Sequence, residues 1–238
     1  MKKLTLIFTI LFISQLTFSQ SVNRQNISLS IGASMPLSDF RKDLINDSTS
    51  GFAKTGVALE FNYMYRLTHN FGVQLMINYS SNAFDNMKYR NALESEHPDY
   101  GVSVESTRNW SSGGAFLGPY LRLPLGSKLS WDIRALAGFM GSYSPSITVR
   151  ATHRENPNDK LEHYLVSSRA VAFAYAMGTG FKYRMRSDMY ILLFGDYFNS
   201  KMSFKDASGW DWDSEPYTDS FDQKITYFSI TLGVGYIL

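Results

Sequence analysis

The sequence contains no cysteine, and only 18% of its 238 residues are charged. The absence of cysteine excludes a disulfide framework, Cys-ligated zinc and thiol catalysis. Soluble proteins carry about 25% charged residues, so this chain is poor in charge. No apolar run beyond residue 20 reaches the roughly 20 residues of a transmembrane helix, and the mean hydropathy is −0.19. A bundle of membrane helices is therefore excluded as well.

The chain also lacks a strong charge of either sign. It has 23 basic and 21 acidic residues, for a formal net charge of +2. Removal of Lys2 and Lys3 would make the two numbers equal, and no basic cluster stands out along the chain. Because nucleic-acid binding depends on neutralising phosphates with clustered Lys and Arg, a nucleic-acid partner is not expected.

The first residues resemble an export signal. Lys2 and Lys3 precede a short apolar run at residues 4–13, and small residues follow up to Ser19. The run is too short to span a bilayer as a helix, and the small residues suit a signal peptidase. We expect a signal peptide at 1–19 and one mature domain at 20–238; an uncleaved membrane anchor is the alternative.

Apolar residues alternate with small or polar ones in eight segments, and aromatic residues are abundant at 15%. Strict alternation is the pattern of a strand with two different faces. The seventh segment is apolar on both faces, so its phase stays open. The eight predicted strands cover residues 26–34, 57–66, 73–80, 114–123, 129–139, 171–184, 189–199 and 227–238.

The connections between these strands alternate between long and short. The short ones, such as "LTHN" and "PLGS", can join only antiparallel neighbours. Pro119 lies within the fourth strand and lacks a ladder donor, so an edge or a bulge is expected there. The long connections are 36–53, 83–108, 144–168 and 200–223, and the short ones are 67–70, 124–127 and 185–188.

The composition of the two faces decides which one points inward. A soluble barrel of lipocalin type would expose Lys, Glu and Gln, whereas the second face here is mostly Ser, Gly, Ala, Thr and Asn. Small residues suit the interior of a narrow barrel, and aromatic residues at strand ends suit a membrane interface. The pattern predicts a closed eight-stranded antiparallel transmembrane up-and-down β-barrel. The interface aromatics would be Tyr65, Phe71, Trp131, Tyr183 and Tyr236.

Three stretches carry a resemblance to a known family: "GFAKTGVALEFNYMYRL", "GPYLRLPLGSKLSWDIRALAG" and "YFSITLGVGYIL". The chain resembles the small outer-membrane β-barrel proteins of Bacteroidota type. The resemblance implies periplasmic termini and short turns, with the long loops outside. It also implies that the barrel assembly machinery reads the last strand, which ends in Leu238 where the usual terminal residue is aromatic, and that this strand closes against the first.

Six charged residues occupy the face assigned to the interior. Three acids face three bases in a closed lumen, and an unpaired charge there costs several kcal/mol. We therefore expect one paired network that plugs the barrel; a gated narrow pore or proton path is the alternative. The six residues are Glu60, Arg122, Asp132, Arg134, Lys182 and Asp196. The inward direction of Asp196 depends on the phase of the seventh strand, which the sequence leaves open.

The four histidines do not form a recognisable catalytic motif. His69 lies in a short turn, and His97, His153 and His163 lie in long connections. A lipid deacylase or acyltransferase would need a histidine, a nucleophilic serine and an acid together. His163 has such residues nearby in sequence, namely Glu162, Ser167 and Ser168. No catalytic residue is assigned.

The last long connection combines acidic and aromatic residues. The glycine at the sixth position of an EF-type Ca²⁺ loop is missing, so no metal site is assigned. The aromatic rings could stack on a sugar or lie at the membrane interface, and a plain solvated acidic loop is the alternative. The candidate binding residues are Trp210, Asp211, Trp212, Asp213 and Tyr217.

The sequence thus predicts a non-enzymatic integral outer-membrane protein without a cofactor, whose role is structural or a surface interaction. Loops on a rigid scaffold commonly carry binding, so the long outer loops would be the binding surface. Expected partners are outer-membrane lipids, the barrel assembly machinery and an unidentified extracellular ligand or envelope protein. A narrow channel for small or hydrophobic solutes and a lipid-modifying enzyme remain alternatives.

Overall fold

The computed structural model describes residues 24–213 and 215–238, so the expected signal peptide lies outside the described residues. No helix in these ranges is long and apolar enough to cross a membrane. The strands are β1 (Gln25–Pro36), β2 (Gly56–Arg66), β3 (Phe71–Asn82), β4 (Tyr100–Ser106), β5 (Trp110–Pro124), β6 (Leu129–Tyr143), β7 (Ile147–His153), β8 (Lys160–Leu165), β9 (Arg169–Arg184), β10 (Met189–Trp210) and β11 (Pro216–Ile237), with helices α2 (Ser38–Arg41) and α3 (Asn86–Glu96).

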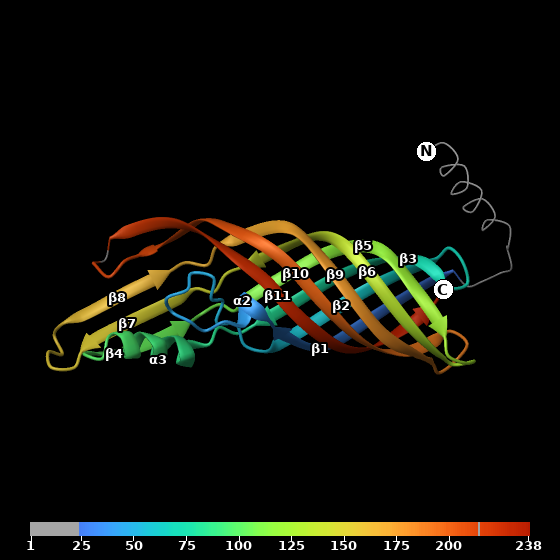
Figure 1. The fold of residues 1–238 in the computed structure, drawn as a ribbon, viewed down its shortest axis with the longest axis horizontal. Coiled ribbons are helices and arrows are strands. Elements are labelled where there is room, and N and C mark those ends of the chain that lie inside the picture. The colour runs from blue at the N-terminus through green and yellow to red at the C-terminus, as the bar shows by residue number, and fades with distance from the viewer. Residues whose placement is uncertain (1–23, 214) are drawn as a thin grey trace.

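Eight of the strands close into one antiparallel barrel (Figure 1). The order is β1-β2-β3-β5-β6-β9-β10-β11, and β11 pairs back onto β1 from Ile237 opposite Asn26 to Tyr227 opposite Pro36. Closure satisfies the backbone groups that an open edge would leave to lipid. The predicted fold class is confirmed, and the closing pair is the predicted one.

The outer face of the barrel is apolar. Leu29 is 60% exposed and Leu232 is 61% exposed, whereas their neighbours Ser30 and Thr231 are buried. The aromatic residues expected at the short-turn end all point outward, and four of them, Phe71, Trp131, Tyr183 and Tyr236, are exposed. The assignment of the two faces therefore agrees with the alternation in the sequence.

The interior holds more large apolar side chains than the sequence analysis assumed. Strand β10 sends Leu192, Phe194 and Phe198 inward, which fixes the phase of the seventh predicted strand. Its neighbour β9 presents Gly180 opposite Phe194 and Ala176 opposite Phe198. The rings therefore fill the space that small residues on the adjacent strand leave free, as close packing requires.

Pro119 lies at neither an edge nor a bulge, contrary to expectation. It pairs with Val73 on β3 inside the closed ring. On its other side the β5–β6 ladder omits Gly118 and Pro119, but the register is the same from Leu117 opposite Ala137 to Tyr120 opposite Arg134. The barrel tolerates the missing donor by interrupting one ladder locally instead of shifting it.

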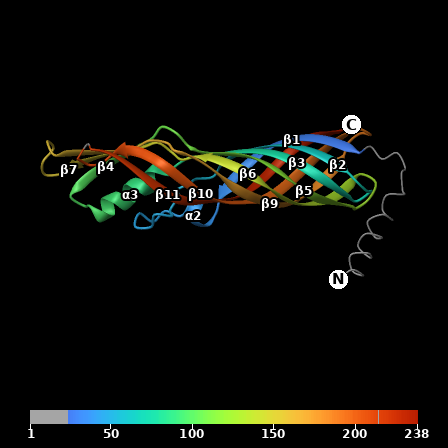
Figure 2. The same cartoon turned by 90° about the horizontal axis from the view of Figure 1, so that it is seen from above.

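The long connections are folded beyond the barrel, where the sequence analysis had expected loops (Figures 1 and 2). Strands β10 and β11 continue as a hairpin past residue 200, and residues 201–210 alone extend it by roughly 30 Å. β8 pairs with the C-terminal end of β10, at Gly209 and Trp210. β7 then pairs with β8, and β4 pairs with β7. Helix α3 lies over β4.

We call this region the outer unit, residues 83–108, 144–168 and 201–224. It has a small apolar core of its own, in which Phe84, Ile147 and Val149 are buried. The ring of Tyr89 from α3 meets Phe84 edge-on at 5.3 Å. The outer unit is thus a packed sheet-and-helix layer and not a set of solvated loops.

A short segment covers the mouth of the barrel beneath the outer unit. Phe40 of α2 is 1% exposed and meets Trp110 edge-on at 5.6 Å. The Trp110 indole donates to the carbonyl of Gly51 at 2.8 Å. These contacts fasten the first long connection over the lumen.

Candidate functional site

One buried ion cluster lies in the middle of the lumen. Arg134 of β6 donates through Nε to Asp196 Oδ1 at 2.6 Å and through Nη2 to Asp196 Oδ2 at 2.5 Å. The same Nη2 reaches Glu60 Oε2 at 2.8 Å. All three side chains are almost completely buried. One cation therefore joins acids from β2 and β10 across the barrel.

Neutral groups complete this mid-lumen cluster. Arg134 Nη1 donates to Asn62 Oδ1 at 2.9 Å, and the Ser229 hydroxyl donates to Glu60 Oε1 at 3.1 Å. The guanidinium carbon lies 4.3 Å from the centre of the Phe194 ring. Buried charges are tolerated when their hydrogen-bonding capacity is met in this way.

A second ion pair lies nearer the short turns. Lys182 Nζ is 2.8 Å from Asp132 Oδ2, and the Ser130 hydroxyl donates to Asp132 Oδ1 at 3.0 Å. The ammonium also lies 5.7 Å and 5.5 Å from the ring centres of Tyr120 and Tyr190. This pair contacts Met64 Sδ but none of the three charged groups of the mid-lumen cluster.

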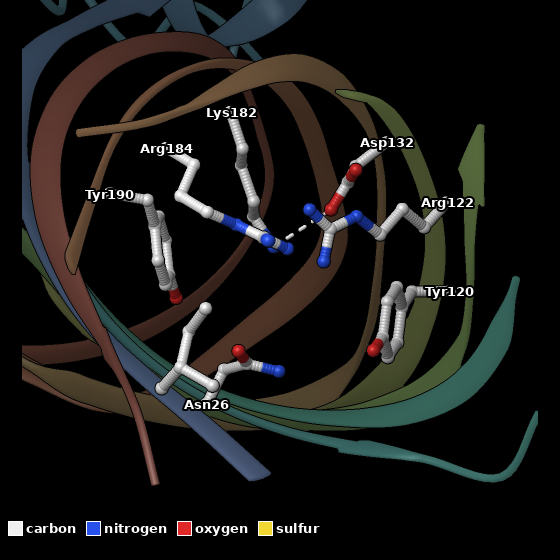
Figure 3. Close-up of a pocket in the computed structure, with 8 residues that line it drawn as sticks. Asn26, Tyr120, Arg122, Asp132, Lys182, Arg184 and Tyr190 are labelled. Carbon is white, nitrogen blue, oxygen red and sulfur yellow. Dashed lines mark ion pairs between the residues drawn. The ribbon is translucent and has the colours of Figure 1, made fainter. Parts of the chain in front are cut away.

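The single network of six charges expected from the sequence is therefore divided into two groups, and Arg122 belongs to neither. Arg122 stands opposite Asp132 in the β5–β6 ladder, but the carboxylate pairs with Lys182 from β9 instead. Figure 3 shows the Arg122 and Arg184 side chains reaching into the same short-turn end of the lumen. The sequence analysis missed Arg184 and Arg66 as members of this region, although both share the interior phase of their strands.

Apolar packing fills the lumen above the ion clusters. Phe198 and Tyr227 stack with ring centres 4.8 Å apart, and Phe116 meets Phe198 edge-on at 5.6 Å. The Tyr227 hydroxyl donates to Asn78 Oδ1 at 2.8 Å. The enclosed cavity beside Asp132 measures only about 10 Å³, about the space of a single water. The lumen is therefore packed from the level of Phe198 down to Asp132.

The aromatic residues singled out in the last long connection lie at the tip of the outer unit. His163 of β8 stacks with Tyr217 at 5.6 Å and lies 5.2 Å from Trp212. Trp210 packs on Tyr164 at 5.5 Å, and both tryptophans remain exposed, at 47% and 39%. Burial lowers the pKa of His163, and burial with the nearby Asp219 and Asp211 raises the pKa of Tyr217.

The acids of this tip hold the turn and do not gather into a site. Asp211 Oδ1 accepts the backbone N–H groups of Asp213 at 3.0 Å and Glu215 at 2.9 Å. Asp213 itself is exposed. Within residues 24–213 and 215–238, no group of three or more His, Asp or Glu side chains is arranged to hold a metal.

The possible catalytic set around His163 does not come together. Glu162 pairs with Arg150 at 3.0 Å, and the Ser167 and Ser168 hydroxyls donate to the carbonyls of Ser144 and Lys205. None of them is bonded to the His163 ring, which shares a hydrogen bond of 3.3 Å with the Tyr217 hydroxyl. The other three histidines lie apart from this set. His153 Nδ1 accepts backbone N–H groups, His97 is the C-cap residue of α3, and His69 is exposed in its turn.

Comparison with known proteins assigns the chain to no family. No family model matches the chain, and no curated protein matches it. Three similar solved structures are Ail, the attachment invasion locus protein of Yersinia pestis, a major outer membrane protein of Thermus thermophilus, and the outer membrane protease OmpT of Escherichia coli.

The identities of these three are low. Ail is 13% identical with a TM-score of 0.41, over 90% of this chain and 98% of its own. The Thermus protein is 12% identical with a TM-score of 0.46, over 89% and 98%. OmpT is 9% identical with a TM-score of 0.33, over 94% and 100%. At these values the likenesses carry no argument about this chain.

Proposed function

We propose that the protein is a non-enzymatic integral outer-membrane barrel whose sealed body anchors the outer unit as a binding surface. The observation that carries this proposal is the contrast between the two parts of the molecule. The barrel interior is packed, whereas the outer unit is a separate folded layer with exposed aromatic rings at its tip. Loops held on a rigid scaffold are where binding is commonly found.

The apolar belt supports placement in a membrane. Leucine, isoleucine, valine and phenylalanine side chains stand exposed around the barrel, as on Leu29, Ile77 and Val234. A soluble monomer rarely exposes a contiguous apolar surface of this extent. In this proposal the belt contacts outer-membrane lipid, the termini are periplasmic, and the barrel assembly machinery inserts the chain.

The packed lumen disfavours the channel alternative. A permeating solute would have to displace the stacked rings of Phe198 and Tyr227 and break the Arg134 cluster. The scattered hydrogen bonds of Glu162, Ser167 and Ser168 disfavour the enzyme alternative, because none of them activates a nucleophile beside His163.

The tip of the outer unit is the part of that surface best suited to contact a partner. Trp210 and Trp212 expose large rings that are already held by Tyr164 and His163. Aromatic anchors that are ordered before binding lose little entropy on contact. The Asp211 hydrogen bonds to the turn add rigidity at the same place.

Co-purification with matched variants tests the proposal. The full chain is extracted in mild detergent, and the molecules retained are identified by mass spectrometry. A Trp210→Ala/Trp212→Ala variant should lose the retained molecule, whereas a Leu44→Ala variant, which removes an exposed apolar side chain elsewhere, should keep it. An identical set of retained molecules in all three preparations would contradict a binding role for the tip.

A further inference from the structure

A second feature lies at the opposite end of the barrel from the outer unit. A cavity of about 220 Å³ opens at the short-turn mouth, and Arg66, Arg122 and Arg184 all line it. The β5–β6 turn adds Lys128 to the rim, and His69 comes from the β2–β3 turn. Three strands, β2, β5 and β9, thus carry an arginine at or near their ends whose side chain reaches the same space.

The positive charge of this cavity is poorly balanced. The charged residues that line it are all basic, and the acid just inside it, Asp132, is already 2.8 Å from Lys182 and bonded to Ser130. Among the described residues, neither Arg122 nor Arg184 has a side-chain ion pair or hydrogen bond. Both guanidiniums lie within Coulombic range of Arg66, and Arg122 is also within range of Lys182.

Like charges in a partly enclosed mouth repel one another, since the low-dielectric walls weaken screening. The remainder of the lumen does not offset this repulsion locally. The surplus acid of the mid-lumen cluster, where Glu60 and Asp196 share Arg134, belongs to a different level of the barrel. An anion entering the mouth would relieve the repulsion.

The chemistry of the lining selects the kind of anion. Arginine presents a planar fork of donors that matches the oxygens of phosphate or carboxylate two at a time. Figure 3 shows the Arg122 and Arg184 side chains converging from two walls of the barrel. Ligand pockets usually measure about 300–1,000 Å³, so a cavity of about 220 Å³ suits a small oxyanion.

We infer that the short-turn mouth is an oxyanion-binding site for a phosphate group held by Arg122 and Arg184, with Arg66 as a third charge. The phosphate belongs either to a free small anion or to the headgroup of a phospholipid in the adjoining leaflet. This site is separate from the outer unit, so it stands or falls independently of the surface-binding role.

Isothermal titration calorimetry on the full chain in maltoside detergent tests the inference. One arm titrates inorganic phosphate with the ionic strength held constant by chloride. The other arm titrates short-chain phosphatidylglycerol, with the corresponding diacylglycerol, which lacks phosphate, as its control. Binding of phosphate in the first arm assigns a free anion, and binding confined to phosphatidylglycerol assigns the lipid headgroup.

Matched variants locate the binding. Arg122→Gln/Arg184→Gln should weaken binding of whichever probe binds by at least about tenfold, since charge-assisted bonds are lost. Arg184→Lys, which keeps the charge and loses the paired donors, should weaken it less. Arg150→Gln removes one positive charge from the outer unit and should leave affinity unchanged; circular dichroism verifies that each variant is folded. Absence of binding by either probe to the unmodified protein, or equal affinity of the double variant and Arg150→Gln, would overturn the site.

Discussion

Arg134 and Asp196 meet over Gly178 of the intervening strand β9 through two parallel hydrogen bonds, Nε to Oδ1 at 2.6 Å and Nη2 to Oδ2 at 2.5 Å. This fork-to-carboxylate geometry is the strongest ion-pair arrangement available to an arginine. It links β6 to β10, and the bond from Nη2 to Glu60 extends the link to β2. A single side chain therefore couples three walls of the barrel.

Replacement of Arg134 should destabilise the barrel strongly. Arg134→Leu leaves Glu60 and Asp196 buried without their cation, which costs about 3–5 kcal/mol in the free energy of unfolding. Ile133→Leu, on the adjacent outward-facing position, should change it by less than about 1.5 kcal/mol. Urea-induced unfolding in lipid vesicles measures both. Equal stability of the two variants would contradict the importance of the cluster.

Gly178 should tolerate no side chain, because it is paired with Arg134 on one side and Asp196 on the other. A Cβ at this position would collide with the Asp196 carboxylate. Gly178→Ala should therefore cost about 1–3 kcal/mol. At Gly141 the nearest atom to a new Cβ is a Val171 methyl at 3.6 Å, so Gly141→Ala should cost little. The same urea titration compares them, and a Gly178→Ala variant as stable as Gly141→Ala would be inconsistent with this packing.

The packing of the outer tip should loosen in acid. Burial lowers the pKa of His163 below its ordinary value of 6.5, against an opposing effect of Asp211. The unfolded tip then binds a proton more readily than the folded tip, so the stabilisation is complete above about pH 6.5 and decreases as the pH falls below it. Trp212 fluorescence should report the change, because its ring lies against His163. His163→Gln should abolish this pH dependence. If the fluorescence of the variant changed with pH as in the unmodified protein, His163 would not be its cause.

Protease accessibility on intact cells should follow the two classes of connection. The exposed hairpin tip between β7 and β8, with Arg154 and Lys160, should be cut first. The end of β9 and the short turn after it, with Arg184 and Arg186, should stay intact, because the proposed topology puts them in the periplasm. Mass spectrometry of the fragments identifies the cut sites. Cleavage at Arg186 in cells with a sealed envelope would reverse the topology.

The barrel was predictable from the sequence because it requires alternating strands and short turns, and both are visible as sequence patterns. A strand with lipid on one side must alternate, as Leu29 and Ile31 do with Ser28 and Ser30. Antiparallel neighbours joined at one end need short turns, and the short connections at 67–70, 124–127 and 185–188 alternate with long ones along the chain. Alternation did not decide β10, because Phe194 points inward and Leu193 outward and both are apolar.

The outer unit and the arrangement of the ion clusters depend on contacts that the sequence does not display. β8 pairs with β10 through only two residue pairs, at Gly209 and Trp210, which are distant along the chain from Leu165 and Tyr164. The choice of Lys182 by Asp132, in place of Arg122 opposite it, depends on how β9 lies beside β6. The alternation along each strand identifies which charged side chains point inward. The partner of each charge depends on its height along the barrel axis and on which strands lie beside it.

The sealed lumen is the central claim, because it assigns the working surface to the outer unit. Planar-bilayer recording on the purified full chain tests it most directly. The packed rings of Phe198 and Tyr227 above the Arg134 cluster predict a current that stays at the baseline of the protein-free bilayer. Reproducible conductance steps that scale with the amount of inserted protein would show an open path through the barrel and contradict the account.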